Sequence, residues 1–518
     1  MYTLGDVSRK GRTLYPDREA LVFEETRITY GKLDDRVNRL ANAISGLGFK
    51  KGERLVILAE NTHKYMEVYF AAGKLGMSVT PLNFRLADAE ITHIVNDSEA
   101  TLFMAGTGYE ERALGLKDDV KGIREWVMLD SHGEGWLNYE DMIREASGED
   151  PGVEVGEDEL AILMYTGGTT GLPKGVMLSH RNIMTSAYGS IMICEFNKDD
   201  ATCFVLPLFH ISLWPALCVL MVGGKVIVMP RPDLMEILRL IQDEKCTHIN
   251  LVPTIYGWIL NVPDIDKYDL SSLRLMTYAG SPFPPDVLRK CIEKFGGIFA
   301  QGYGLTEAAP LVSFLMAEDH VLDGPERLTR RLTSAGKEGP VVEARVFDED
   351  DKPVKVGEIG EICARGKNIM QGYWKNPELT EKTLRNGWLH TGDMGTVDED
   401  GFIYLMDRKA DMIVTGGENV YPKEVEDVLY EHPAVQECAV VSAPDPKWGE
   451  RVQAVVSFKE GQSADPEELI TFCKSKLAGY KCPKGVEVWD SIPKTVVGKI
   501  IRKDVKAHFW ADSTRKIN

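Results

Sequence analysis

The chain has 518 residues, more than one hydrophobic core usually serves, so at least two domains are expected. Its 60 lysines and arginines against 79 aspartates and glutamates give a formal net charge of −19. This charge argues against a general nucleic-acid or anionic-membrane surface, because its field repels phosphate. Any anionic substrate must therefore be held by local groups.

The first half of the chain alternates helical and strand patterns. Helices are predicted over residues 30–46, 67–74 and 234–243, and strands over residues 55–58, 161–165, 225–229 and 248–252. Such alternation is typical of an α/β fold with a largely parallel sheet.

The second half changes character twice. Residues 341–363 read as short alternating strands with acidic, proline- and glycine-containing turns, which indicates a small β-rich subdomain. A new α+β pattern then starts near residue 408, with helices over 422–432 and 466–477 and strands over 438–442, 452–458 and 486–490. We expect an α/β protein with a large N-terminal domain (residues 1–407), built of α/β subdomains plus this β-rich subdomain. A smaller α+β C-terminal domain (residues 408–518) follows.

Cysteine usage and the apolar runs bear on location. The nine cysteines are scattered and form no C-x-x-C pair, which indicates free thiols in a reducing cytoplasm. The N-terminus lacks the apolar core of a signal peptide, and the longest apolar run, residues 213–222, is interrupted by Pro215. We expect a cytoplasmic protein without a transmembrane segment, and peripheral membrane contact stays open.

The strongest local signal is T-G-G-T-T-G-L-P-K-G at residues 166–175, after a predicted strand. Glycines let the backbone fold tightly so that N–H groups converge on phosphate oxygens, while hydroxyls and an ammonium add donors. The candidate phosphate-binding residues are Thr166, Gly167, Gly168, Thr169, Thr170 and Lys174. The alternative is a glycine-rich hairpin, which does not call for three hydroxyls and a lysine. No G-K pair is followed by Ser or Thr, so this is not a Walker A loop.

A second motif, Q-G-Y-G-L-T-E at residues 301–307, places a flat ring, a hydroxyl and a hard carboxylate within five residues. That combination suits a nucleotide with its metal. Three further segments are Y-A-G-S-P-F at residues 278–283, T-G-D at 391–393 and P-K-T-V-V-G-K-I-I-R-K at 493–503. Each of these three is a weak signal alone.

In this order the motifs resemble those of the ANL superfamily of adenylate-forming enzymes, in its acyl-CoA synthetase (fatty or aryl acid–CoA ligase) branch. The resemblance covers nearly the whole chain. It implies that ATP and Mg²⁺ activate a carboxylic acid as an acyl-adenylate and release pyrophosphate. A thiol then takes the acyl group and AMP leaves, with coenzyme A as the expected co-substrate.

The resemblance also implies roles for single residues. Tyr303 stacks on adenine, Thr306 contacts phosphate and Glu307 helps to hold Mg²⁺. The remaining candidates around adenine are Gly280, Ser281 and Gly302.

Two of the later motifs are given roles at the ribose and the phosphate. Asp393 accepts both ribose hydroxyls, and Arg408 contacts the ribose or phosphate. Lys499 meets the α-phosphate and the carboxylate, where its ammonium stabilises developing negative charge. A solvated basic tail is the alternative for Lys499, and the order and spacing of the motifs argue against it.

The same lysine cannot occupy the pocket while a thiol attacks, which predicts a lid that swings about a hinge. The family's hinge residue, usually Asp or Lys, is here Ala410. After rotation the loop with Gly416 and Gly417 would line the pantetheine tunnel, with Gly417 closest. Trp448 matches a tryptophan that contacts the nucleotide end of CoA, and core packing is an equally supported reading.

The resemblance places the acid beside His210, whose neutral ring can donate a hydrogen bond to the substrate carboxylate or gate its entry. A structurally satisfied histidine is the alternative. Relatives that activate amino acids carry Asp here to pair with the substrate ammonium, which imidazole cannot do. The expected pocket, residues 207–214, 253–258 and 308–312, is apolar, with Leu208, Phe209, Leu213 and Trp214. A fatty, alicyclic or aromatic acid fits such a lining.

Other functions stay open at this point. The sixteen residues after Arg502 leave no room for a fused carrier domain, so the acceptor is expected from outside the chain. A stand-alone acyl-AMP ligase that loads a carrier protein and a luciferase-like oxygenase use the same adenylate. An inert nucleotide-binding protein is disfavoured because Lys174, Glu307, Asp393 and Lys499 are all present. The family habit is a monomer or homodimer.

Overall fold

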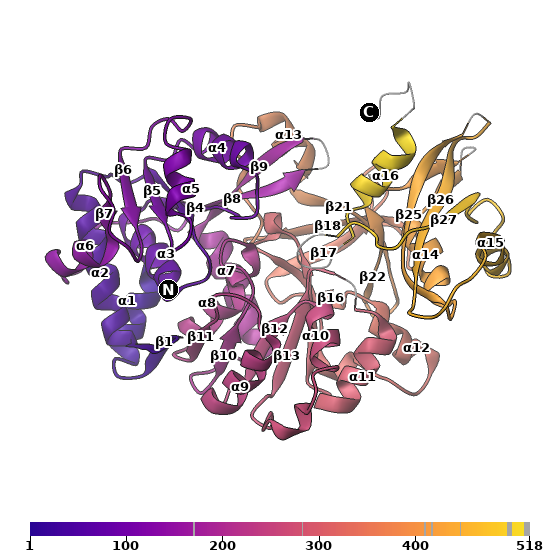
Figure 1. Ribbon diagram of the computed structural model, residues 1–518, viewed down its shortest axis with the longest axis horizontal. Coiled ribbons are helices and arrows are strands. Elements are labelled where there is room, and N and C mark those ends of the chain that lie inside the picture. Colours follow the sequence, from indigo (N-terminus) through magenta and orange to yellow (C-terminus); the bar gives the residue numbers. More distant parts are fainter. Residues whose placement is uncertain are drawn as a thin grey trace. The chain divides into compact units, whose positions relative to one another are not determined.

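The computed structural model describes residues 1–168, 171–281, 283–408, 411–415, 418–445, 447–494 and 500–511. The chain divides into two compact units (Figure 1). Unit 1 comprises residues 1–344 and 364–390, and unit 2 comprises residues 345–363 and 391–518. Unit 2 thus also takes in residues 345–363 and 391–407, which the sequence pattern assigned to the N-terminal domain. The expected hinge residue Ala410 lies outside the described residues.

Unit 1 contains a nine-stranded sheet, sheet A, in the order β16-β15-β14-β13-β12-β10-β11-β1-β2. Its strands are β1 (Glu19–Phe23), β2 (Thr26–Thr29), β10 (Ala201–Phe204), β11 (Lys225–Val228), β12 (His248–Leu251), β13 (Leu275–Ala279), β14 (Phe299–Gly304), β15 (Leu311–Leu315) and β16 (Lys337–Glu338). The strands from β11 through β10, β12 and β13 to β14 run parallel, and β15 turns antiparallel. Most of these strands are buried along their length, which explains their continuous apolar runs.

A second sheet of unit 1, sheet B, has eight strands in the order β19-β9-β8-β4-β3-β5-β6-β7. They are β3 (Arg54–Leu58), β4 (Ser78–Pro81), β5 (Leu102–Ala105), β6 (Glu125–Met128), β7 (Leu137–Asn138), β8 (Leu160–Gly168), β9 (Gly171–Ser179) and β19 (Gly372–Tyr373). Strands β8 and β9 form an antiparallel hairpin, and β19 pairs antiparallel with β9. The other neighbours are parallel, so the expected α/β class is confirmed.

Helices of unit 1 pack on these sheets (Figure 1). They are α1 (Gly5–Leu14), α2 (Tyr30–Gly46), α3 (His63–Leu75), α4 (Asp88–Asp97), α5 (Glu110–Gly115), α6 (Tyr139–Glu145), α7 (His180–Cys194), α8 (Trp214–Met221), α9 (Leu234–Glu244), α10 (Pro253–Ile259), α11 (Pro285–Phe295), α12 (Glu326–Thr329) and α13 (Pro377–Thr383). Helix α2 begins at the predicted residue because the Thr29 hydroxyl accepts the Lys32 N–H. Helix α3 ends at Gly76, which adopts the left-handed conformation that glycine allows.

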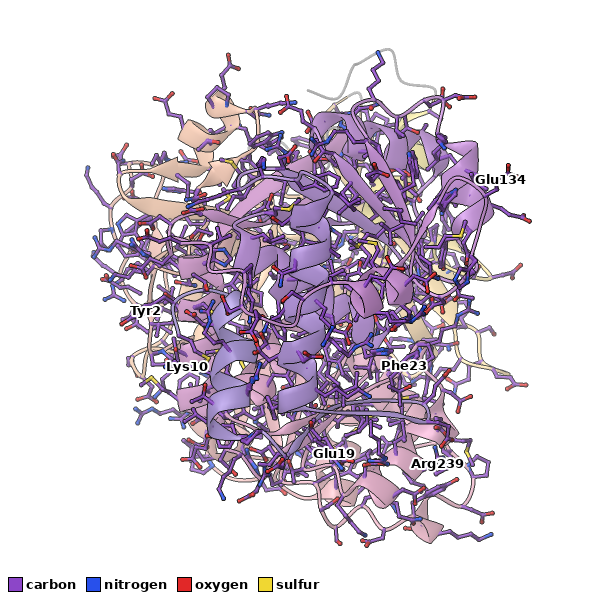
Figure 2. All side chains as sticks on the ribbon, turned by 90° about the vertical axis from the view of Figure 1, so that its left-hand side faces the viewer. Tyr2, Lys10, Glu19, Phe23, Glu134 and Arg239 are labelled. Carbon is purple, nitrogen blue, oxygen red and sulfur yellow. The ribbon has the colours of Figure 1, made fainter. Side chains whose placement is uncertain are left out.

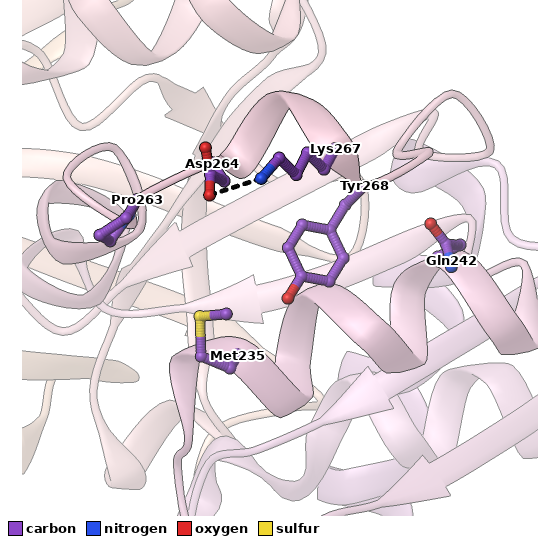
Figure 3. Close-up of a pocket in the computed structure, with 6 residues that line it drawn as sticks. All are labelled: Met235, Gln242, Pro263, Asp264, Lys267 and Tyr268. Atoms are coloured by element: carbon purple, nitrogen blue, oxygen red, sulfur yellow. Dashed lines mark hydrogen bonds and ion pairs between the residues drawn. The ribbon is translucent and has the colours of Figure 1, made fainter.

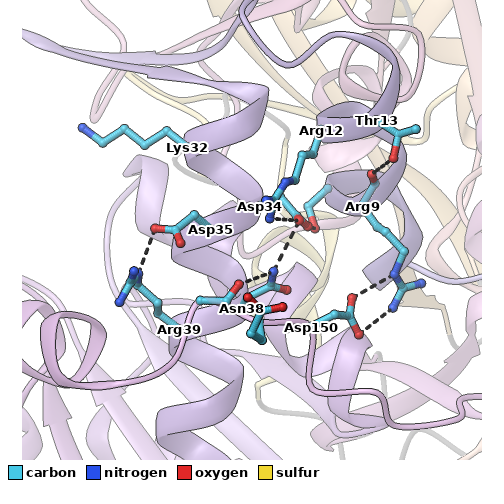
Figure 4. Close-up of polar contacts among 12 residues, drawn as sticks. Arg9, Arg12, Thr13, Lys32, Asp34, Asp35, Asn38, Arg39 and Asp150 are labelled. Atoms are coloured by element: carbon cyan, nitrogen blue, oxygen red, sulfur yellow. Dashed lines mark hydrogen bonds and ion pairs between the residues drawn. The ribbon is translucent and has the colours of Figure 1, made fainter.

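Buried charges join the first helices of unit 1. Lys74 Nζ on α3 is fully buried and lies 2.6 Å from Asp34 Oδ1 on α2 and 3.2 Å from Asp150 Oδ2. Arg9 on α1 adds a second cation, with Nε 2.9 Å from Asp150 Oδ2 (Figure 4). A buried ammonium is tolerated only with such partners, so this network fixes α1, α2 and α3 together. Lys10, Glu134 and Arg239 are exposed at the surface, where water solvates their charges (Figure 2).

Unit 2 carries a five-stranded sheet in the order β24-β23-β26-β25, with β27 beside β26. Its strands are β23 (Ile413–Thr415), β24 (Glu418–Val420), β25 (Val435–Asp445), β26 (Gly449–Phe458) and β27 (Gly485–Val488), and its helices are α14 (Pro422–Tyr430), α15 (Pro466–Lys474) and α16 (Arg502–Trp510). The predicted α+β pattern is confirmed here, and α16 is a helix that the sequence reading missed. Valines and leucines of α14, α15, β25 and β26 form the core of this sheet.

A second five-stranded sheet comprises β17 (Val342–Phe347), β18 (Gly360–Gly366), β20 (Leu384–Arg385), β21 (Trp388–Val397) and β22 (Ile403–Arg408). It contains the strands expected between residues 341 and 363. All nine cysteines are buried free thiols, as predicted, and burial raises the pKa of the Cys203 thiol well above its ordinary value. No helix among the described residues is long and apolar enough to cross a membrane.

Candidate active site

Four neighbouring strands of sheet A bring the predicted motifs of unit 1 to one edge. Strands β10, β12, β13 and β14 are parallel, so their carboxyl ends meet at the same edge, where α/β proteins bind ligands. The segment with His210 follows β10, residues 253–258 follow β12, and Gly280 and Ser281 follow β13. Tyr303 is the next-to-last residue of β14, and Thr306 and Glu307 follow the strand. The topology therefore assembles motifs that are far apart in the sequence.

Glycine occurs in these segments for different structural reasons. Gly280 has φ +85°, which side chains rarely adopt, while an added Cβ would meet no atom within 4 Å. A positive φ, and not a lack of space, is therefore the reason for glycine at this position. At Gly302 a Cβ would lie 2.7 Å from Leu311 Cδ2, and at Gly304 it would lie 1.9 Å from the Pro310 oxygen. Gly304 is needed because a Cβ there would overlap the backbone that leads into the next strand, β15, whereas at Gly302 a Cβ would meet only the end of the Leu311 side chain.

His210 precedes the short 3₁₀ helix η1 (Ile211–Leu213) and exposes its ring. Its Nδ1 accepts the Ser212 backbone N–H at 3.3 Å, so the neutral ring carries its proton on Nε2. Desolvation by the surrounding protein lowers the pKa of His210, which favours this neutral form. Within the described part of the chain, Nε2 has no hydrogen-bond partner. The ring is therefore satisfied on one side and offers a donor on the other.

The segment before His210 is fixed from helix α3 and the residues before it. The Leu208 N–H donates to Asn61 Oδ1 at 2.8 Å, and Tyr69 Oη donates to the Leu208 carbonyl at 3.0 Å. Phe209 packs edge-on against Phe84, with ring centroids 5.2 Å apart. The sequence reading did not find Asn61, Tyr69 or Phe84, because nothing in their local pattern marks them.

The predicted acyl lining is apolar and mostly buried. Leu208, Phe209, Leu213 and Trp214 are each at most 8 % exposed. Trp258 at the end of the expected lining is different, since it is 55 % exposed. An apolar wall next to a hydrogen-bond donor suits the carboxyl end of a hydrophobic acid.

The T-G-G-T-T-G segment runs from the end of β8 to the start of β9, and these two strands pair as an antiparallel hairpin. Thr166 lies opposite Lys174, and Gly168 lies opposite Gly171. Thr169 and Thr170 lie outside the described residues, as do the side-chain surroundings of residues 167–172. From the sequence, a hairpin and a phosphate-binding loop were treated as alternatives. The backbone on both sides of the segment forms a hairpin, so the two readings do not exclude each other. A hairpin turn can still offer N–H groups to phosphate, so the phosphate role stays a prediction.

Lys174 and Glu307, from separate motifs, meet the same side chain. Tyr373 Oη donates to Glu307 Oε1 at 2.7 Å, and Lys174 Nζ lies 5.4 Å from the centre of the Tyr373 ring. Among the described residues, Glu307 Oε2 accepts no hydrogen bond. A free carboxylate oxygen is the hard ligand that Mg²⁺ prefers, so the residues present fit this ion. Sequence reasoning missed Tyr373, because a G-Y pair is too common to mark a site.

The T-G-D motif of unit 2 has a clear local structure. The Thr391 hydroxyl donates to the Ile362 carbonyl at 2.7 Å and accepts the Asp393 N–H at 3.1 Å. Gly392 has φ +74°, and its N–H donates to Glu361 Oε1 at 3.0 Å. The Asp393 backbone lies opposite Arg408 on β22, where the register shifts. The motif thus holds Asp393 at a bulge, a common way to aim one side chain.

The remaining predicted residues of unit 2 are less fully described. Trp448 is 46 % exposed, which rules out the core-packing reading, and Lys447 Nζ lies 4.5 Å from its ring centre. Lys499, Gly416 and Gly417 lie outside the described residues, and so does the side chain of Arg408.

A surface pocket of about 390 Å³ lies elsewhere in unit 1. It is lined by Met235, Gln242, Pro263, Asp264, Lys267 and Tyr268 (Figure 3). None of the predicted site residues is in this lining, and its Asp264 and Lys267 already pair at 2.7 Å. The pocket is therefore separate from the site described above.

The α/β fold, with the carboxylate and the histidine at one edge of sheet A and the lysine on the β8–β9 hairpin of sheet B, defines the class of adenylate-forming enzymes. Residues 9–374 match the AMP-binding enzyme model, and residues 424–499 match the AMP-binding enzyme C-terminal domain. A feruloyl-CoA synthase from Amycolatopsis sp is 37 % identical over 508 residues, 98 % of this chain and 99 % of that protein.

Two further similarities come from other members. A fatty acid–[acyl-carrier-protein] ligase from Streptomyces coeruleorubidus is 34 % identical over 514 residues, 97 % of this chain and 96 % of that protein. The solved Mycobacterium tuberculosis fatty acyl CoA synthetase has a TM-score of 0.81 and 30 % identity, covering 99 % of both chains. The chain belongs to the AMP-binding enzyme family, in the acyl-CoA synthetase branch of the ANL superfamily.

Proposed function

We propose that the chain is an ATP-dependent acyl-CoA synthetase for a hydrophobic carboxylic acid, whether fatty, alicyclic or aromatic. The acid and ATP form an acyl-adenylate and pyrophosphate, and CoA then takes the acyl group and releases AMP. One observation carries the proposal: His210, the Gly280 segment and Glu307 follow neighbouring parallel strands of sheet A. An acid and a nucleotide bound at this edge would lie side by side.

In the first half-reaction the substrate carboxylate attacks the α-phosphorus, and negative charge grows on the phosphoryl oxygens. Lys174 adds positive charge to the phosphates, and Lys499 would add a second ammonium at the α-phosphate. Glu307 Oε2 would hold Mg²⁺, which when bound neutralises charge on the phosphate oxygens. His210 donates its Nε2 proton as a hydrogen bond to the substrate carboxylate and so orients it.

The nature of the acid follows from the same histidine. A neutral imidazole offers no negative charge to an α-ammonium group, so an α-amino acid is disfavoured. The buried side chains of Leu208, Phe209 and Leu213 supply an apolar wall instead. A hydrophobic acid therefore gains from burial while His210 meets its polar end.

In the second half-reaction the C-terminal residues are proposed to form a lid that turns about Ala410. The lid would carry Lys499 away and bring Gly417 to the pantetheine chain. The exposed Trp448 ring, with the Lys447 ammonium over it, offers a stacking surface and a charge to the nucleotide end of CoA. The free thiols support a cytoplasmic location. A monomer or homodimer stays a prediction.

The acceptor is tested by measuring AMP release with a hydrophobic acid while free CoA is varied. We expect AMP release to rise with CoA and acyl-CoA to form in equal amount. A stand-alone ligase that loads a carrier protein would instead show no rise with CoA and would respond to an added carrier protein. That result would replace the proposed acceptor and leave the adenylation step intact.

A further inference from the structure

Tyr373 is the side chain that joins Lys174 of the hairpin to Glu307 of the β14 motif. We propose that Tyr373 is a positioning residue that separates these two charges, so that Glu307 is left for the metal ion and Lys174 for the phosphates. This inference rests on the proposed function, because it assigns a purpose to the nucleotide site. It adds a residue that lies outside both phosphate-binding motifs.

The contacts of Tyr373 differ on its two parts. The hydroxyl donates to one oxygen of Glu307, Oε1, at 2.7 Å. The Lys174 ammonium lies over the ring, 5.4 Å from the ring centre. The side chain is only 6 % exposed, so water competes little for either contact.

This arrangement prevents a competing ion pair. Lys174 and Glu307 carry opposite charges, yet within the described ranges they form no ion pair with each other. A direct pair would neutralise both groups and compete with the phosphates and the cation for them. With the hydroxyl on Oε1, the second oxygen of Glu307 is the one left to a cation.

The backbone of Tyr373 is itself fixed. Its N–H donates to Thr380 Oγ1 at 2.9 Å, and Gly372 before it has φ +143°. A Cβ at Gly372 would lie 2.6 Å from Thr380 Cγ2, so a glycine is required by both conformation and space. Tyr373 pairs with Val176 on β9, close to Lys174 on the same strand. The ring is thereby held beside the lysine.

The chain that leads to Tyr373 is tied to Glu307 as well. The Met370 N–H donates to the Glu307 carbonyl at 2.8 Å, and Asn368 Nδ2 donates to the Ala308 carbonyl at 2.8 Å. On the other side, Asn182 Nδ2 donates to the Ile369 carbonyl at 2.6 Å. Residues 368–373 thus connect the carboxylate to the hairpin at several points, which suits a segment that sets their spacing.

The test measures binding of a non-hydrolysable ATP analogue by calorimetry, with and without Mg²⁺ and without acid or CoA. Tyr373→Phe removes the hydroxyl and keeps the ring. We expect the gain in affinity that Mg²⁺ provides to fall about tenfold, the size of a lost hydrogen bond to a charged group. Affinity without Mg²⁺ should stay within about twofold of the parent chain, because the Lys174 ammonium keeps its contact with the aromatic ring.

A matched control and a second variant sharpen the test. Tyr404→Phe removes another tyrosine–carboxylate bond, from Tyr404 Oη to Asp398 Oδ2 at 3.0 Å, in unit 2. It should leave the Mg²⁺ gain unchanged. Tyr373→Leu should also weaken binding without Mg²⁺, and Tyr373→Phe should have no further effect in a Glu307→Gln chain.

The proposal is overturned if Tyr373→Phe keeps the full Mg²⁺ gain, or if Tyr404→Phe loses as much. It is also overturned if Tyr373→Phe lowers the gain equally in the Glu307→Gln chain. The isosteric Phe variant decides the matter should the Leu variant fail to fold. Since no acid is present, a chain that activates no acid would still report on Tyr373, which separates this inference from the proposed function.

Discussion

The Tyr278 hydroxyl donates to His320 Nε2 at 2.9 Å, just before the Gly280 segment. His320 Nδ1 in turn donates to the Met316 carbonyl at 2.8 Å, so the tautomer of this buried ring is set by both bonds. The pair ties the end of β13 to the chain after β15, and it thereby supports the edge where adenine is proposed to bind.

We predict that Tyr278→Phe destabilises unit 1 by roughly 1–3 kcal/mol, because His320 Nε2 is left buried without its donor. The KM for ATP should rise several-fold while the KM for the acid changes little. Urea unfolding and steady-state kinetics measure the two effects. A normal urea midpoint would contradict the structural role of this bond.

Gly280 offers a test in which conformation and ligand contact can be separated. Gly296 has a similar φ, +90°, and like Gly280 has no atom within 4 Å of an added Cβ. Gly280→Ala and Gly296→Ala should each lower stability, because both place a side chain at a positive φ. Only Gly280→Ala should raise the KM for ATP. An equal rise in both variants would mean that the strain alone disturbs the site.

His210 is predicted to act through its Nε2 proton. His210→Leu should lower kcat/KM for the acid by about tenfold to a hundredfold, because the carboxylate loses its donor. His210→Gln places an amide N–H near the same position and should retain much of the activity. Since desolvation by neighbouring protein atoms lowers the pKa of His210, the activity should not fall as pH drops through about 6.5. Loss of activity centred at pH 6.5, absent from His210→Gln, would contradict this.

The fold itself should be sensitive to acid through His248. Its Nδ1 lies 2.9 Å from Thr202 Oγ1 and its Nε2 lies 2.9 Å from Thr277 Oγ1, and burial lowers its pKa from 6.5 to about 3. The unfolded chain therefore binds a proton that the folded chain excludes. Stability is fully present above about pH 6.5 and falls as pH decreases towards 3, by about 1.4 kcal/mol per pH unit for this group.

The comparison variant is His248→Gln, which cannot take up that proton. Its unfolding free energy, measured by urea titration at several pH values, should fall less steeply than that of the parent chain. Equal slopes would show that His248 is not excluded from protonation in the folded state.

The proposed lid is tested at Lys499. Lys499→Ala should lose about a hundredfold or more in adenylation, the effect of removing a key charge-stabilising group. It should still form thioester from pre-formed acyl-adenylate and CoA, because the second half-reaction does not use the lysine. Equal loss in both half-reactions would contradict a lid with two positions.

The sequence predicted the parts of the fold that depend on local pattern. Helix α2 and the strands of sheet A have apolar periodicity and recognisable ends, such as the Thr29 cap. Helix α3 begins at His63, earlier than predicted. Its first turn contains Lys64, which is buried and whose ammonium lies 2.7 Å from Asp130 Oδ1. A lysine that finds a distant partner cannot be distinguished from a surface lysine by local pattern.

The residues of the candidate site also fall into those that a local sequence pattern reveals and those that it does not. Motifs of several residues, such as the one with Glu307, could be found because their chemistry lies within one short segment. Tyr373 and Asn61 could not, because each acts through a contact with residues distant in the chain. Trp448 was left open by the sequence, and only its exposure showed that it does not belong to a core.

Activation of a hydrophobic acid with ATP can be measured by exchange of labelled pyrophosphate into ATP across linear, cyclohexyl and aryl acids, with Glu307→Gln as the control. We expect exchange that requires both an acid and Mg²⁺ and that falls strongly in Glu307→Gln. Exchange with none of these acids would contradict the proposed activation and would favour a nucleotide-binding protein without adenylating activity.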